Sequence, residues 1–211
     1  MTGIELVALA ASTSLLAGWR LYLVTLVTGL AMKFGYVGLP EQLQALDVLT
    51  NNWVLGIAAV GTFAEFFADK IAWVDSAWDS VHAFIRPVGG ALLSLAIVDA
   101  GDPAWQIASF LAGGGAALVA HAGKAGARTL INASPEPYSN MAVSTMEDIA
   151  TGGLLALAIA NPIAAAIVAA MLVFLSIWLV FRARRAIKRV MDVITLKPRM
   201  KNVTPPPSSG V

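Results

Sequence analysis

Two groups of ionisable residues lie in parts of the chain that are otherwise apolar enough for membrane-spanning helices. Glu65 and Asp69 are spaced i, i+4, and His121, Lys124 and Arg128 are spaced i, i+3 and i+7, so each group follows one face of a helix. A charged side chain in hydrocarbon is costly and usually faces a bundle interior or a water-filled cavity. The pattern therefore predicts a polar site inside a membrane protein, where an acidic and a basic helix face meet.

Two interpretations of this site are open. The charges could form an ion-pair network that only fixes the packing of the helices. They could instead line a pathway or a binding site for an ion, a small anionic solute or a lipid headgroup, which the number of ionisable groups favours. The candidate transport or ligand-binding residues are Glu65, Asp69, His121, Lys124, Arg128 and Asp148.

A second set of polar residues has more local explanations. Arg20 lies deep in an apolar stretch and is expected to pair with a carboxylate from another helix. Asp79 and Glu147 each follow a serine by three residues, which is the capping-box pattern of a helix start, so we expect them to act as caps. Lys70 is expected to extend its ammonium to the membrane interface. The secondary site candidates are Arg20, Asp79, His82, Arg86, Asn132 and Glu147.

The chemistry of a bound metal or cofactor is not specified by these residues. The carboxylates with a histidine would suit a hard or intermediate divalent cation, but Lys124 and Arg128 would repel it and are better suited to an anion. There is no nucleotide-binding loop, no Gly-x-Ser-x-Gly motif and no cysteine. We therefore expect no cofactor and leave the metal unknown, and the residues give no positive indication of an enzyme.

Composition places these charges in a membrane protein. Of 211 residues, 58% are hydrophobic and 13% are charged, and the mean hydropathy is +0.75. Soluble domains have about 25% charged residues. The formal net charge of +1 gives no indication of nucleic acid, and we expect the lipid bilayer to be the main partner.

The apolar runs predict an all-α, polytopic membrane protein with about six transmembrane helices. A span needs roughly 20 apolar residues, or fewer where a neighbouring amphipathic segment extends the helix. The runs cover residues 4–34, 53–72, 87–98, 105–131, 146–160 and 162–181. The amphipathic segments between them, such as 73–86, are expected to be half-helices that re-enter the membrane or lie at its surface.

The chain is predicted to be one transmembrane domain, 1–190, with a cytoplasmic and largely disordered tail, 191–211. Basic residues follow the sixth run at 182–189, and such residues favour the cytoplasmic side of a membrane. An even number of spans then places both termini in the cytoplasm. The expected location is the inner (plasma) membrane of a cell, as a multi-pass protein.

Residues 53–98 and 105–160 are candidates for an internal duplication. Gly89-Gly90 and Gly152-Gly153 each precede a similar Leu/Ala-rich run. Aligning these glycines places Glu65 opposite Arg128 and Asp69 opposite Asn132, and ligand sites of transporters often lie between repeats. The alternative is chance recurrence of Gly-Gly and Leu-Ala runs, which are common in membrane helices.

Small residues on one face of the fourth run permit close packing of helices. Ala112, Ala116 and Ala120 are spaced by four residues. Such a face suits either a homo-oligomer or contacts within one chain.

Several motifs together resemble a bacterial membrane family known as domain of unknown function 4126, over about residues 15–185. The resemblance implies a small polytopic membrane domain, without an assigned activity and without functional residues that could be transferred. The motifs that carry it are Glu65-Phe-Phe-Ala-Asp69-Lys70, Val74-Asp75-Ser-Ala-Trp78-Asp79-Ser-Val-His82, Phe84-Ile-Arg86-Pro87, His121-Ala-Gly-Lys124 and Asn132-Ala-Ser134-Pro135.

Three functions are compatible with these observations. The leading hypothesis is a small transporter or channel for an ion or small anionic solute, with the charged residues along its pathway. The second is a non-enzymatic lipid-binding or scaffold protein that holds anionic headgroups. The third is an intramembrane enzyme acting on lipid phosphates, for which His121 and the carboxylates could supply acid–base chemistry.

Overall fold

The computed structural model describes residues 3–36, 47–98, 103–132 and 137–200 of the chain. Within these ranges the chain is helical and has no strand, which confirms the expected all-α class. The helices are α1 (Gly3–Lys33), α2 (Asn52–Ala68), α3 (Ala72–Val98), α4 (Pro103–Asn132), α5 (Pro137–Ala160) and α6 (Pro162–Met200).

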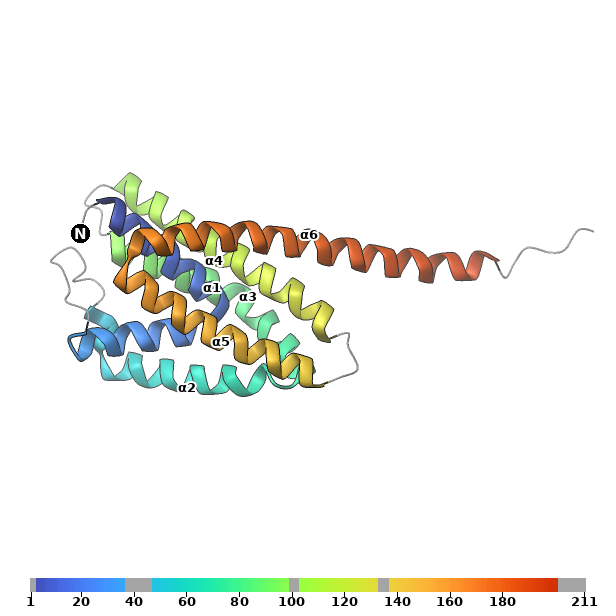
Figure 1. Cartoon of the computed structure of the whole chain (residues 1–211), viewed down its shortest axis with the longest axis horizontal. Coiled ribbons are helices and arrows are strands. Elements are labelled where there is room, and N and C mark those ends of the chain that lie inside the picture. Colours follow the sequence, from blue (N-terminus) through green and yellow to red (C-terminus); the bar gives the residue numbers. More distant parts are fainter. Residues whose placement is uncertain (1–2, 37–46, 99–102, 133–136, 201–211) are drawn as a thin grey trace, which may run out of the picture.

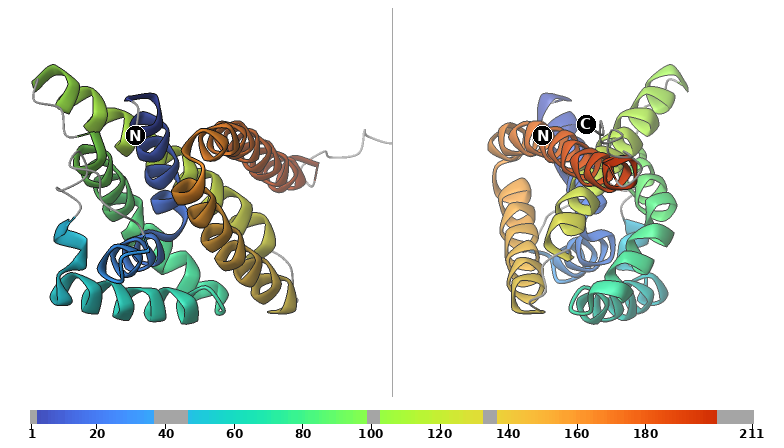
Figure 2. Two further views of the ribbon diagram at one scale, coloured as in Figure 1. Left: turned by 60° about the vertical axis from the view of Figure 1, so that its left-hand side comes forward. Right: turned by 90° about the vertical axis from the view of Figure 1, so that its right-hand side faces the viewer.

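Helix α1 consists of two half-helices instead of one straight span. Arg20 has φ −143° and ψ 72°, a conformation that interrupts the helix near its middle. Figure 1 shows the two halves as a V, with both ends of α1 at the same end of the bundle. The first half lies between α3 and α6 (Figure 2).

Contacts with α3 show the reversal at Arg20. From the first half, Ser14 Oγ donates to the carbonyl of Gly90 at 2.8 Å. From the second half, Leu21 lies against the preceding residue of α3, because a Cβ at Gly89 would be 2.5 Å from Leu21 Cδ1. Residues 14 and 21 would be about 10 Å apart along a continuous helix. The second half of α1 therefore turns back along α3.

The remaining helices begin and end at recognisable local signals. The side chain of Asn51 accepts a hydrogen bond from the Trp53 N–H at 2.8 Å and so caps α2. Asn161 accepts one from the Ala164 N–H at 3.0 Å, and Pro162 occupies the first position of α6. The amphipathic segment 73–86 is not a separate element: α3 runs without interruption through Pro87.

The length of the helices agrees with a membrane protein. By length and composition α1, α3, α4, α5 and α6 could each cross a bilayer, while α2 has 17 residues, or about 25 Å. Helix α1 differs from α3, α4, α5 and α6 because it folds back on itself at Arg20. As a result, the start of α1 and the far end of α6 lie at opposite ends of the molecule (Figure 1).

The predicted tail is helical over its first ten residues, because α6 continues to Met200 and extends beyond the bundle (Figure 1). Residues 201–211, on which the rest of that prediction falls, lie outside the described part of the chain.

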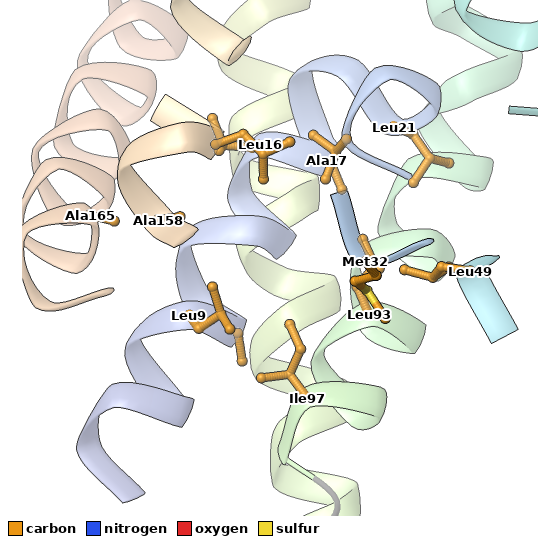
Figure 3. Packing of buried hydrophobic residues seen from close by; sticks show 13 residues of the cluster. Leu9, Leu16, Ala17, Leu21, Met32, Leu49, Leu93, Ile97, Ala158 and Ala165 are labelled. Carbon is orange, nitrogen blue, oxygen red and sulfur yellow. The ribbon is translucent and has the colours of Figure 1, made fainter. Parts of the chain in front are cut away.

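An apolar core fills the end of the bundle where α1 begins and ends. Leu9 and Met32, from opposite ends of α1, belong to one buried cluster with Leu93 and Ile97 of α3 (Figure 3). Leu155 of α5 is fully buried in the same cluster. Both halves of α1 thus contribute to the apolar end of the bundle.

Small residues allow α1, α3 and α4 to approach one another closely. A Cβ at Gly18 would lie 2.2 Å from the Ala117 carbonyl oxygen, and one at Gly90 would lie 2.5 Å from the Ala117 side chain. Ala120 is likewise buried against Leu15. Of the predicted small-residue face of α4, Ala116 and Ala120 therefore pack within the chain, while a homo-oligomer remains a prediction.

Candidate functional site

The predicted acidic and basic helix faces meet inside the bundle, in what we call the charged network. Eight of its side chains, contributed by α1–α4 and the α2–α3 turn, are 0–7% exposed. Those of Glu147 and Asp148 from α5 are 15% and 25% exposed. The network comprises Arg20, Glu65, Asp69, Asp79, Arg86, His121, Lys124, Arg128, Glu147 and Asp148.

Arg20 lies at the break of α1 and joins α2 to α5. Its guanidinium forms an ion pair with Asp69, lies 3.1 Å from Asp148 and 3.5 Å from Glu147, and donates to the Ser144 carbonyl at 3.2 Å. The expectation that Arg20 pairs with a carboxylate from another helix is confirmed. These partners hold an arginine in a conformation that interrupts the helix without a glycine or proline at that position.

Arg86 joins α2, α3 and α4. It pairs with Glu65 and donates to Asp79 at 3.0 Å. His121 Nδ1 lies 2.6 Å from the Arg86 guanidinium, and His121 Nε2 lies 3.1 Å from the Asp79 carbonyl oxygen. Because arginine can only donate, Nδ1 must accept and Nε2 must carry the hydrogen, so these contacts select one neutral tautomer of His121.

Lys124 occupies the middle of the network. Its Nζ lies 3.5 Å from Asp69, 3.8 Å from Glu147, 3.9 Å from Glu65 and 4.0 Å from Asp79. It also lies 3.4 Å from the carbonyl oxygen of Trp19, at the end of the first half of α1. Every one of these distances exceeds the 2.7–2.9 Å typical of a charge-assisted hydrogen bond.

Arg128 connects α4 with α5 and with the end of α2. It donates to the side chain of Asn140, lies 2.8 Å from Glu147 and is 3.5 Å from Asp69 Oδ2. Asn140 Nδ2 in turn donates to the Asp69 carbonyl at 2.9 Å. Asp75 of α3 also lies beside Asp69 and Arg128. Arg128 therefore anchors the turn between α2 and α3.

The capping interpretation of Asp79 and Glu147 is wrong. α3 begins at Ala72 and α5 at Pro137, so both carboxylates lie within a helix. They pair instead with Arg86 and Arg128. The capping-box pattern is local, and it does not distinguish a helix start from an interior serine and acid at the same spacing.

Two further polar residues lie at the edge of the network. Lys70 donates to Ser144 Oγ at 2.7 Å and lies 4.0 Å from the Phe66 ring centroid, so its ammonium contacts protein groups. Burial lowers the pKa of Lys70, and the nearby Asp148 carboxylate opposes that change. His82 is bonded to Tyr22 Oη at 3.0 Å, away from the ion pairs. The side chain of Asn132 lies outside the described part of the structure.

Asp75 was not among the site candidates, and three further residues were also missed: Asn140, Ser144 and Tyr22. Each is an ordinary polar residue in an amphipathic or apolar stretch and carries no motif of its own. A helical-wheel comparison could have found two of them, because Asn140, Ser144 and Glu147 follow at i, i+4 and i+7 along one face of α5. Tyr22 has no such signal.

Arginine and lysine side chains neutralise the described carboxylates in this structure. Among the described residues no group of three His, Asp or Glu side chains is placed to hold a metal ion. Some buried atoms nevertheless have no hydrogen-bond partner in that part of the chain, including Glu65 Oε2 and Arg86 Nε. Orphaned polar atoms of this kind are rare among buried groups.

A groove of about 400 Å³ between α3 and α4 reaches one side of the network. Asp79, His121 and Arg128 form part of its wall, together with the apolar residues Ala83 and Leu118. The network is thus accessible from one flank of the bundle, between two helices, in this structure.

A family model matches residues 7–182, which contain the complete network. The chain belongs to the family described as domain of unknown function DUF4126. The resemblance inferred from the motifs is therefore confirmed. Neither the curated proteins nor the solved structures compared with this DUF4126 protein include a match.

Proposed function

We propose that this protein is a small membrane transporter that carries an ion or small charged solute through the charged network. The observation that carries the proposal is the break of α1 at Arg20, in the middle of buried ion pairs from three other elements. Broken helices at the binding site are a recurring feature of secondary transporters.

The break gives the network backbone groups as well as side chains. A helix end leaves carbonyl and N–H groups without intrahelical partners, and inside a membrane this is tolerated only where protein or a water-filled cavity satisfies them. Lys124 lies 3.4 Å from the Trp19 carbonyl at this position. A packing network alone would not need an interrupted helix at its centre.

The two charged faces contact each other directly, so the pathway is closed in this structure. Lys124 and Arg128 both lie 3.5 Å from Asp69. The apolar cluster around Leu93 and Ile97 fills the opposite end of the bundle from the network. Transport then requires a second state in which ion pairs separate and the two halves of α1 move relative to α3.

The test is flux into proteoliposomes that contain the purified protein. We expect ion-dependent charge or pH changes above those of empty liposomes. Glu65→Gln and Asp69→Asn should each reduce this flux at least about tenfold, because each removes a central charge of the pathway. Asp192→Asn, which changes an exposed carboxylate on the projecting part of α6, is the matched control and should transport normally. Equal flux in all four proteins would remove the role assigned to the network.

We also propose that the basic end of α6 is cytoplasmic and the start of α1 lies on the opposite face. Arg184, Arg185, Lys188 and Arg189 are exposed beyond the apolar part of α6, and basic residues favour the cytoplasm. Since α1 folds back at Arg20, the chain makes five crossings by α2–α6. This replaces the expectation of two cytoplasmic termini.

Cysteine labelling tests this orientation because the chain has no native cysteine. In inside-out vesicles, a cysteine at Arg184 should react with a membrane-impermeant maleimide, and one at Ile4, which is exposed at the start of α1, should react only after the membrane is opened. Labelling of both in intact vesicles of one orientation would contradict the five-crossing topology.

A second candidate function is the retention of a lipid headgroup in the groove between α3 and α4. Arg128 offers a positively charged donor group beside the apolar surface of Leu118, a combination that suits a headgroup with its acyl chain. Native mass spectrometry of the purified protein should then show a retained anionic lipid that is lost in Arg128→Gln. Retained lipid together with absent flux would favour this function over transport.

A further inference from the structure

Lys124 lies in a cage of oxygens, each of which is farther from Nζ than in a typical ammonium–carboxylate hydrogen bond. The cage consists of carboxylate oxygens of Glu65, Asp69, Asp79 and Glu147 at 3.5–4.0 Å from Nζ. The Trp19 carbonyl at the end of a half-helix completes it at 3.4 Å. A lysine ammonium paired with one carboxylate would be expected at 2.7–2.9 Å. Here the charge is instead shared among several oxygens, as for a coordinated ion.

The charge of the cage corresponds to a single positive ion. Its four carboxylates face three arginines that are ion-paired with them: Arg20 with Asp69, Arg86 with Glu65 and Asp79, and Arg128 with Glu147. Arginine stays protonated in proteins. Among these four carboxylates and three arginines one negative charge therefore remains, which Lys124 balances. Asp148, outside the cage, lies 3.1 Å from Arg20 and has Lys70 as a second neighbouring cation.

Two observations besides the acidic cluster point to a ligand. Glu65 is 1% exposed, yet its Oε2 has no hydrogen-bond partner among the described residues. The second is the half-helix end itself, because the carbonyl end of a broken helix attracts cations and coordinates Na⁺ in some transporters. Glu65 Oε1 and the Trp19 carbonyl both face Lys124 Nζ, and an inorganic cation, which is not tethered to a helix, can approach such oxygens more closely than Lys124 does.

We infer that the cage around Lys124 is a binding site for a monovalent inorganic cation, which the Lys124 ammonium occupies in this structure. The inorganic cation enters when the Lys124 side chain moves out of the cage, so the cage holds one positive charge in either state. This inference names the substrate class of the proposed transporter and rests on that proposed function. An anion is disfavoured because every oxygen of the cage is an acceptor.

The experiment replaces Lys124 by a neutral residue and measures whether an inorganic cation binds in place of its ammonium. Purified Lys124→Met is unfolded thermally in detergent in choline chloride and in NaCl, KCl and RbCl at equal ionic strength. We expect a midpoint about 3–6 °C higher in at least one alkali chloride, at a salt concentration of about ten times the dissociation constant. The wild-type protein should show no such difference. Binding of radioactive sodium or rubidium should reach one ion per Lys124→Met protein.

Two matched variants separate a specific site from a general salt effect. Lys70→Met removes a cation outside the cage and should show no alkali dependence. The double variant Glu65→Gln/Lys124→Met removes one charge of each sign, and so should be as stable in choline chloride as in alkali chlorides. An alkali-dependent shift of similar size in either variant would contradict the inference.

Failure to fold is also informative. The inference predicts that an alkali cation substitutes for the lost ammonium, so Lys124→Met and the smaller Lys124→Ala should fold at least in the presence of that cation. Either a folded Lys124→Met with the same midpoint in all four salts, or failure of both variants to fold in any salt, would overturn the inference.

The outcome is independent of the transport assay. Cation binding by Lys124→Met without flux in the wild type would identify a structural cation site and remove the transport proposal. Flux without cation binding in the variant would keep the transporter and remove this substrate class.

Discussion

The two ends of this bundle are built from the same helices by different interactions. At one end, α3 and α5 contribute Asp79, Arg86 and Glu147, and the elements are joined by ion pairs. At the other end, the same helices contribute Ile97 and Leu155, which are packed in the apolar core. The half-helices of α1 meet where the two ends join, at Arg20.

The difference indicates which end of the closed bundle can rearrange more easily. Close packing of apolar side chains tolerates few rearrangements, whereas an ion-pair network can exchange partners while every charge stays near an opposite one. Lys124, with four carboxylates within 4.0 Å, has several such partners available. The charged end is therefore where we expect a change of state to begin.

The largest effect should come from breaking a buried ion pair at the charged end. Arg86→Met leaves Glu65 and Asp79 without their closest cation, and removing one partner of a buried pair costs about 3–5 kcal/mol. Thermal unfolding in detergent should show a much lower midpoint, and adding Glu65→Gln to Arg86→Met should recover part of the loss. Arg184→Met, on the exposed part of α6, is the control. Equal midpoints for Arg86→Met and Arg184→Met would show that the ion pairs contribute nothing to stability.

A smaller loss should follow from forcing apart the close contact of α1 with α4. In Gly18→Ala the new Cβ would meet the Ala117 backbone oxygen at 2.2 Å, so the helices must separate. Overpacking of this kind costs about 1–3 kcal/mol. Gly115→Ala on α4 meets nothing within 4 Å and should instead be neutral or stabilising, by up to about 1 kcal/mol. The same sign of change in both variants would contradict the close contact.

The junction of the two ends should be less sensitive. Tyr22→Phe removes the hydrogen bond between Tyr22 Oη and His82 while leaving the ring in place. We expect a loss of about 0.5–1.5 kcal/mol in unfolding free energy. Tyr36→Phe, at an exposed tyrosine, is the matched control. A change below that of Tyr36→Phe would mean that the Tyr22–His82 bond does not hold α1 against α3.

The smallest effect is expected at the edge of the charged network. Lys70→Met removes the hydrogen bond to Ser144 and the contact with Phe66, but it also removes the cost of partly burying an ammonium. The unfolding free energy should change by less than about 1 kcal/mol. A loss as large as that of Arg86→Met would extend the essential network to Lys70.

Much of the charged network could be predicted from spacing alone. Glu65 with Asp69, and Lys124 with Arg128, each follow one helix face, and buried charges of opposite sign lower each other's desolvation cost. Arg20 was predicted to have a carboxylate partner for the same reason. The roles of these residues in transport or binding stay predictions.

Other features could not be obtained in this way. Asp79 and Glu147 looked like caps because the pattern is read over four residues, while the start of α3 at Ala72 depends on the turn after α2. No proline marks the break at Arg20, and the nearby Gly18 has another explanation in its close contact with α4. The proposed duplication of 53–98 in 105–160 also remains a prediction.

The sequence by itself determined a helical membrane protein with too many buried charges for hydrocarbon, because composition and helical periodicity are local properties. Only the tertiary structure decided that α1 folds back at Arg20 and that three arginines and Lys124 share the carboxylates. Those outcomes depend on the electrostatic energy of charges brought together from five helices, which no single segment contains.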